Sequence, residues 1–125
     1  MSIKYAIDTS AWIEYFNGSN KKISDIIENS ATGTPLIVIA ELSDKFCREK
    51  IDFREYFNFI NSKSKLLQLS LNVCMTAGQL KTKMRKERQS FGLSDALIYL
   101  TSIENGSVLV TKDLDFTGMD KIILI

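Results

Sequence analysis

The 125-residue sequence contains no histidine, and this absence excludes much of the usual chemistry of hydrolytic sites. Histidine is the side chain that most readily titrates near neutral pH, and it is the commonest protein ligand of transition metals. Serine–histidine triads, imidazole-based nucleases and histidine–zinc centres are therefore ruled out. Metal or acid–base chemistry in this chain has to use other side chains.

Cysteine, proline and glycine are also scarce, with two, one and six copies respectively. Cys47 and Cys74 are too few for a disulfide framework or a four-thiolate metal site, and we expect both to pack as small apolar residues in a reducing cytosol. The chain has no apolar run near the roughly 18 residues of a membrane span, and its first residues lack the pattern of a signal peptide. These features predict a soluble, cytoplasmic protein without a membrane partner.

The remaining composition is typical of a globular protein, with 45% hydrophobic and 25% charged residues. At roughly 150 residues per domain, this length predicts one domain over residues 1–125. The 16 basic and 15 acidic side chains give a formal net charge of +1. A polyanionic partner would therefore be attracted by local patches rather than by the overall charge.

Short apolar runs alternate with helical patterns along the chain. Short runs of mostly apolar residues predict strands at residues 3–7, 36–39, 66–69, 107–111 and 121–125, and most of these runs are rich in β-branched residues. Amphipathic spacing predicts helices between them, with Ser94 capping the start of the last long helix and Gly106 following its end. This alternation predicts an α/β fold with a parallel sheet and helices on both faces.

Four carboxylates stand near one edge of this predicted sheet. Asp8 ends the first strand, Glu41 follows the second, Asp113 follows the fourth, and Asp95 lies in the first turn of the last long helix. Open parallel sheets bind ligands outside the carboxyl ends of their strands. Four converging carboxylates would repel one another, which a divalent cation relieves, and oxygen ligands favour Mg²⁺ or Mn²⁺ over zinc.

Each acid also has a purely structural explanation. Asp8 could belong to a helix cap, Asp95 could be an ordinary acid of a first helical turn, and Asp113 could stabilise a turn. Glu41 could pair with Lys45 one helical turn later. The placement of all four at one edge of the sheet favours a common site.

The segments around these acids resemble the four-acid pattern of PIN-domain nucleases. Asp8 in IDTS, Glu41 in IAEL, Asp95 in GLSDALI and Asp113 in VTKDLDF carry the resemblance, and residues 91–116 are similar to VapC-type toxin ribonucleases. The resemblance implies a single PIN-like domain with a five-stranded parallel sheet of order 3-2-1-4-5. It also implies Mg²⁺- or Mn²⁺-dependent cleavage of RNA, frequent homodimers and neutralisation by a cognate antitoxin.

The resemblance further assigns roles to individual residues. Four positions match the catalytic acids that bind metal in the family: Asp8, Glu41, Asp95 and Asp113. Asp115 matches an acid present in many members and competes with Asp113 as the main ligand. Thr9 or Ser10, together with Thr111, match the neighbouring polar supports.

A basic run, KTKMRKER, occupies residues 81–88. Lys81, Arg85 and Arg88 have the spacing of one helical stripe, which would follow an RNA phosphate backbone or simply face solvent. Tyr15 and Phe59 fall outside the main apolar faces, so they are candidates for a dimer or antitoxin surface, although core packing is the alternative.

Two other functions fit the same residues. The four acids would serve equally well in a PIN-like nuclease of RNA processing or DNA repair. A non-catalytic module that binds metal or nucleic acid, such as a receiver-like domain, would share the architecture, since fold does not fix function. A receiver would carry its phosphoacceptor acid after the third strand, where this sequence has none.

Overall fold

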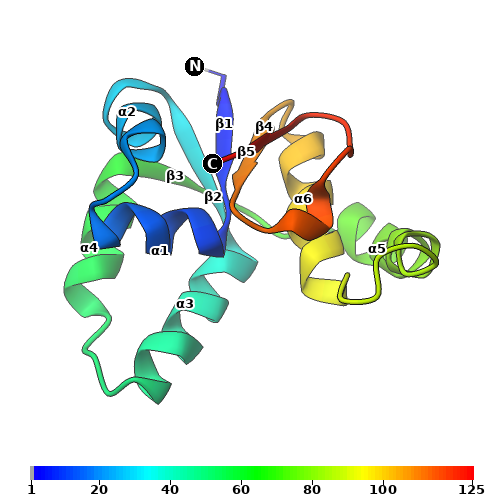
Figure 1. Cartoon of the computed structure of the whole chain (residues 1–125), viewed down its shortest axis with the longest axis horizontal. Coiled ribbons are helices and arrows are strands. Elements are labelled where there is room, and N and C mark those ends of the chain that lie inside the picture. Colours follow the sequence, from blue (N-terminus) through cyan, green and yellow to red (C-terminus); the bar gives the residue numbers. More distant parts are fainter. Residues whose placement is uncertain (1) are drawn as a thin grey trace.

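The computed structural model describes residues 2–125 and contains a five-stranded parallel sheet (Figure 1). The strands are β1 (Tyr5–Ile7), β2 (Thr32–Pro35), β3 (Ser64–Leu67), β4 (Val108–Thr111) and β5 (Ile122–Leu124). Their order across the sheet is β3-β2-β1-β4-β5, and every neighbouring pair is parallel. The predicted fold class and strand order are confirmed.

Six α-helices and one short 3₁₀ helix connect the strands within the described residues. They are α1 (Thr9–Asn17), α2 (Lys21–Asn29), α3 (Leu36–Arg48), α4 (Arg54–Lys63), α5 (Leu71–Met84), α6 (Leu93–Glu104) and η1 (Leu114–Phe116). In Figure 1, α1 and α4 lie on one side of the strands, whereas α5 and α6 lie together on the other. No helix within residues 2–125 is long and apolar enough to cross a membrane.

The core surrounds the two central strands on both faces. Ala6 and Ile7 of β1 and Leu109 and Val110 of β4 are completely buried. Successive strand residues point to opposite faces of a sheet, so this unbroken burial requires helices on both sides. Packing on both faces therefore fixes the position of the carboxyl ends of the central strands.

The second strand lies before the apolar run that predicted it. The expectation of a strand at residues 36–39 is wrong, because this segment forms the first turn of α3. Pro35 ends β2 and is the N-cap residue of that helix, with a φ of −58°. Gly33 allows close strand packing, since a Cβ there would lie 2.8 Å from the Leu67 side chain.

Other predicted boundaries shift by a few residues. The third strand begins at Ser64, two residues before the predicted segment 66–69. Gly92, rather than Ser94, caps α6. Gly106 follows the end of α6 with a φ of 68°, as expected for a left-handed helix terminus.

One expectation about side-chain burial is wrong. Cys47 and Cys74 are exposed instead of packed in the core. Tyr15 and Phe59 are half-buried and stack on each other with ring centroids 5.6 Å apart, and both rings also contact Trp12. Core packing, the alternative stated for these two aromatic residues, is therefore confirmed.

Candidate functional site

The four acids singled out in the sequence line one cavity at the carboxyl edge of the sheet. The cavity has a volume of about 190 Å³. Its lining residues are Asp8, Thr9, Ser10, Ile13, Glu41, Asp95, Ile98 and Asp113. The two isoleucines, which no polar motif in the sequence indicates, give the cavity an apolar wall. Segments distant in the sequence thus bring four carboxylates to a common space.

Asp8 is the buried centre of this site, with only 5% of its surface exposed. Its Oδ1 accepts hydrogen bonds from the Ala11 N–H at 3.0 Å and the Ser10 hydroxyl at 2.7 Å, while its Oδ2 accepts one from the Thr111 hydroxyl at 2.5 Å. Burial raises the pKa of Asp8, an effect that these three hydrogen bonds oppose and the nearby charge of Asp113 reinforces. Asp8 therefore caps α1 and also belongs to the acid cavity.

The hydroxyl groups around Asp8 connect the end of β4 to the start of α1. Thr111 Oγ1 accepts a hydrogen bond from the Asp113 N–H at 2.9 Å. Ser10 Oγ accepts one from the Lys112 N–H, also at 2.9 Å. A single network of short polar side chains thus fixes both Asp8 and the loop that carries Asp113.

Glu41 reaches the cavity from the second turn of α3. The sequence predicted Glu41 two residues after a strand, whereas the residue lies within a helix. The Thr9 hydroxyl donates to Glu41 Oε1 at 2.5 Å. Lys45 pairs with Glu49 instead, at 2.5 Å, so the helical pair proposed as an alternative for Glu41 does not form.

Three half-buried aspartates form the open side of the site. Asp95, Asp113 and Asp115 each offer a carboxylate oxygen, and these oxygens lie within 4.8 Å of one another. Asp95 Oδ2 accepts a hydrogen bond from the Gly92 N–H at 2.7 Å, and Asp113 Oδ1 accepts one from the Asp115 N–H at 2.9 Å. Both Asp113 and Asp115 therefore approach Asp95, although Asp113 alone of the two lines the cavity.

The electrostatics of this cluster favour a bound cation. Burial raises the pKa of Asp95 to about 6; the Gly92 hydrogen bond opposes the rise, and the charges of Asp113, Glu41 and Asp115 add to it. None of the ion pairs found within residues 2–125 includes an acid of the cavity or Asp115. Carboxylate oxygens without a cationic side chain suit a hard divalent ion such as Mg²⁺ or Mn²⁺.

The sequence as a whole matches the family model described as "PIN domain", over residues 5–122. The chain belongs to the PIN domain family. The family resemblance noted in the sequence is thereby confirmed. Comparison with curated protein sequences found no match.

Solved structures share this PIN fold over nearly the whole chain. DNA-bound VapBC from Salmonella typhimurium matches with a TM-score of 0.76 and 19% identity, covering 98% of this chain and 97% of that one. VapBC2 from Rickettsia felis, bound to a promoter DNA fragment, matches with a TM-score of 0.75 and 20% identity over 98% of both chains. VapC20 from Mycobacterium tuberculosis, described as a sarcin–ricin loop cleaving toxin, matches at 0.71 and 13% over 94% and 96%.

The basic run of this PIN domain is divided between a helix and a turn. Because α5 ends at Met84, the prediction that Lys81, Arg85 and Arg88 share one helical stripe is wrong. Arg88 lies beyond the helix, and its Nη1 donates to the backbone carbonyls of Asp115 at 2.9 Å and Thr117 at 2.7 Å. Lys81 and Arg85 remain at the end of α5, where Arg85 is exposed.

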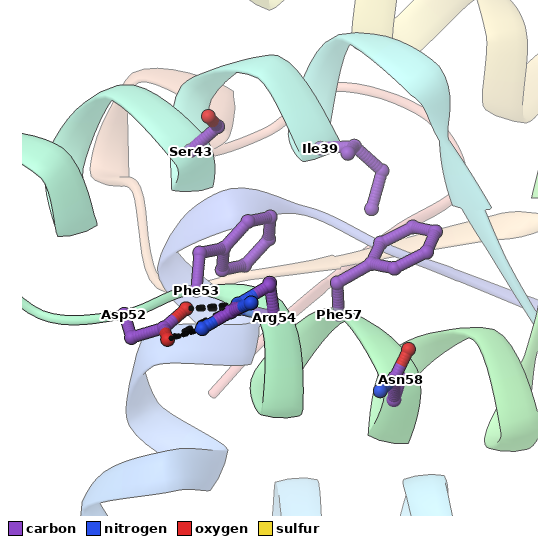
Figure 2. A pocket seen from close by; sticks show the side chains of 7 residues that line it. All are labelled: Ile39, Ser43, Asp52, Phe53, Arg54, Phe57 and Asn58. Carbon is purple, nitrogen blue, oxygen red and sulfur yellow. Dashed lines mark hydrogen bonds and ion pairs between the residues drawn. The ribbon is translucent and has the colours of Figure 1, made fainter.

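A second hollow, between α3 and α4, has a different chemistry (Figure 2). Ile39, Phe53 and Phe57 line this groove of about 610 Å³. At its rim, Arg54 pairs with Asp52 at 2.7 Å, and hydrogen bonds from Arg54 lower the pKa of Asp52 to about 2. Its one carboxylate already has a cationic partner, so the groove does not resemble the acid cavity.

Proposed function

We propose that this PIN domain is an endoribonuclease that depends on Mg²⁺ or Mn²⁺ and acts as the toxin of a toxin–antitoxin pair. The observation that carries the proposal is the convergence of Asp8, Glu41, Asp95 and Asp113 on one cavity. The carboxylates of Asp95 and Asp113, together with Asp115, would hold the cation. Membership of the PIN family and the likeness to a protein described as a sarcin–ricin loop cleaving toxin support the same conclusion.

A divalent cation bound by these acids would make water a better nucleophile and offset charge on the scissile phosphate. Glu41, held through Oε1 by Thr9, keeps its second oxygen to orient the attacking water and accept its proton. Water attacks phosphorus in line, so that a new P–O bond forms while the bond to the 3′ oxygen breaks, and the departing 3′ oxygen takes a proton from solvent. The products therefore carry a 5′-phosphate and a 3′-hydroxyl.

Binding contacts, rather than the reaction itself, would select RNA, because no step uses the 2′-hydroxyl as a nucleophile. Lys81 and Arg85 at the end of α5 are the proposed phosphate contacts. Such contacts release counterions, so replacing both residues with glutamate should weaken RNA binding and flatten its salt dependence. An unchanged salt slope would contradict this role. The proposed place of action is the cytoplasm, where its RNA substrates would be found.

The proposal includes a cognate antitoxin and a homodimer. Similar solved structures include a toxin–antitoxin complex from Klebsiella pneumoniae, with a TM-score of 0.73 and 20% identity over 96% of both chains. Expression of this chain alone should arrest growth, and co-expression of a small protein encoded beside it should restore growth. Light scattering of the purified protein tests the homodimer.

Cleavage assays distinguish the proposed activity from its alternatives. Labelled RNA, single-stranded DNA and double-stranded DNA are incubated with the protein in Mn²⁺, in Mg²⁺ and in excess chelator. Cleavage of RNA that requires a divalent cation supports the proposal, whereas preferential cleavage of DNA indicates a repair nuclease. Binding without cleavage indicates a non-catalytic module, and robust cleavage in chelator contradicts the metal mechanism.

A further inference from the structure

Arg88 connects the two segments that carry the half-buried aspartates. Its Nη1 bridges the carbonyl oxygens of Asp115 and Thr117, at 2.9 and 2.7 Å. These two carbonyls lie on either side of Phe116, which is buried at the end of η1. The guanidinium therefore fixes the backbone of the loop that presents Asp113 and Asp115.

The main chain of Arg88 is hydrogen-bonded within the segment that leads to Asp95. Its N–H donates to the Met84 carbonyl at the end of α5, at 2.9 Å, and its carbonyl accepts from the Phe91 N–H at 3.0 Å. Phe91 is fully buried against Phe116, with ring centroids 5.6 Å apart. The next residue, Gly92, caps α6 and donates to the Asp95 carboxylate.

We propose that Arg88 is a positioning residue that sets the spacing between Asp95 and the pair Asp113 and Asp115. Its functional consequence rests on the metal-dependent activity proposed above. Arginine suits this task because its planar group presents several donors in a fixed arrangement, whereas lysine offers a flexible single ammonium. Arg88 thus serves the acid cluster through the backbone and does not contact RNA phosphates as the basic run alone suggested.

The first test uses Arg88→Gln and Arg88→Lys, with Arg85→Gln as a control of matched charge on an exposed neighbour. Mn²⁺ binding is titrated below the unfolding temperature of each variant. Arg88→Gln should raise the Mn²⁺ dissociation constant about tenfold, the lower end of the effect of losing an outer-shell support. Arg88→Lys should give an intermediate value, while Arg85→Gln should match wild type.

RNA binding by the two variants should show the opposite pattern to Mn²⁺ binding. Arg85→Gln should weaken RNA binding and leave Mn²⁺ binding unchanged, while Arg88→Gln should do the reverse. Arg88→Gln should also need about tenfold more Mn²⁺ for half-maximal cleavage, with an unchanged KM for RNA once Mn²⁺ is saturating. If Arg88→Gln weakens RNA binding as Arg85→Gln does and leaves Mn²⁺ binding unchanged, the proposal is overturned.

Hydrogen exchange separates failure of this proposal from failure of the proposed function. Without the guanidinium, the amides of residues 115–117 should exchange faster in Arg88→Gln than in wild type or Arg85→Gln. This comparison needs neither metal nor RNA. Wild type that cleaves no RNA would overturn the nuclease, but exchange would still decide the role of Arg88, and unchanged exchange at residues 115–117 would reject it.

Discussion

Two aspartates on the same molecule show opposite electrostatics. Asp52 lies exposed at the rim of the α3–α4 groove, where Arg54 lowers its pKa to about 2. Asp95 is half-buried beside other carboxylates, and its pKa rises to about 6. The first acid has its counter-charge within the chain, whereas the second has three acids as neighbours.

This difference indicates what each region is built to do. An exposed ion pair such as Asp52 and Arg54 adds little to stability, since the median contribution is about 0–1 kcal/mol. Several converging carboxylates destabilise the folded state unless a ligand compensates them, and perturbed pKa values of this kind cluster at functional sites. We therefore expect the acid cavity, and not the exposed Asp52–Arg54 pair, to bind a ligand.

The largest expected difference between the two regions is the loss of RNA cleavage when an acid is neutralised. Asp95→Asn, Asp8→Asn and Glu41→Gln should each reduce metal-dependent RNA cleavage by more than about 100-fold, beyond the usual effect of losing an outer-shell residue. Asp52→Asn should cleave at the wild-type rate. Rates are measured with labelled RNA at saturating Mn²⁺. Equal losses in Asp52→Asn and Asp95→Asn would remove the distinction between the two regions.

The two acids that follow β4 should also differ. Asp113 lines the cavity, and its carboxylate accepts a hydrogen bond from the Asp115 N–H. Asp115 belongs to the acidic cluster but does not line the cavity. Asp113→Asn should therefore lose more cleavage activity than Asp115→Asn under the same conditions. The reverse order would identify Asp115 as the main ligand.

A smaller effect is expected for the hydroxyl that supports Asp8. Thr111→Val removes the donor to Asp8 Oδ2, and leaving a buried acceptor unsatisfied should lower the free energy of unfolding by about 1–3 kcal/mol. Thr101→Val is the matched control, because Thr101 Oγ1 is buried and has no hydrogen-bond partner within residues 2–125. Denaturant unfolding should show Thr101→Val at or above wild-type stability. An equal loss of stability in both variants would contradict a stabilising role of the hydrogen bond from Thr111 to Asp8.

The smallest expected effect is a pH dependence of opposite sign in the two regions. The pKa of Asp95 is higher in the folded chain than its ordinary 3.8, so the folded state holds that proton more tightly. In chelator, the contribution of Asp95 to the free energy of unfolding should fall as pH rises from about 4 to about 6, and Asp95→Asn should remove this slope.

Asp52 should contribute in the reverse sense. Because its folded pKa is lowered, its stabilising contribution is complete above its ordinary pKa of 3.8 and disappears as pH falls towards 2. Unfolding curves of wild type, Asp52→Asn and Asp95→Asn at several pH values measure both contributions. Identical slopes for wild type and Asp95→Asn between pH 4 and 6 would show that folding does not raise the pKa of Asp95.

The central strands and the acids were predictable because their patterns are local. The runs around Ala6 and Leu109 are mostly apolar with little alternation, as expected of strands buried on both faces. The rule that ligands meet the carboxyl ends of parallel strands then located Asp8 and Asp113. Glu41 also lines the cavity, although the strand predicted before it is a helix.

Features that depend on tertiary contacts could not be read from the sequence. The segment Thr32–Pro35 has no apolar run, yet its residues are buried between two neighbouring strands. Residues 36–39, the first turn of α3, contain three β-branched residues, and such residues are also typical of strands. Arg88 has the spacing of a helical stripe, but its partners are backbone carbonyls of a distant loop, which no periodicity encodes.

Thermal unfolding of wild type and Asp95→Asn, each in chelator and in millimolar Mn²⁺, tests most directly whether the acids form one cation site. Asparagine keeps an oxygen for the Gly92 N–H but removes one charge from the cluster. In chelator, Asp95→Asn should be more stable than wild type. Mn²⁺ should stabilise wild type by about 2.7 kcal/mol at a hundredfold excess over its Kd, and the variant much less. A variant no more stable in chelator, with the same shift in Mn²⁺, would contradict a shared site.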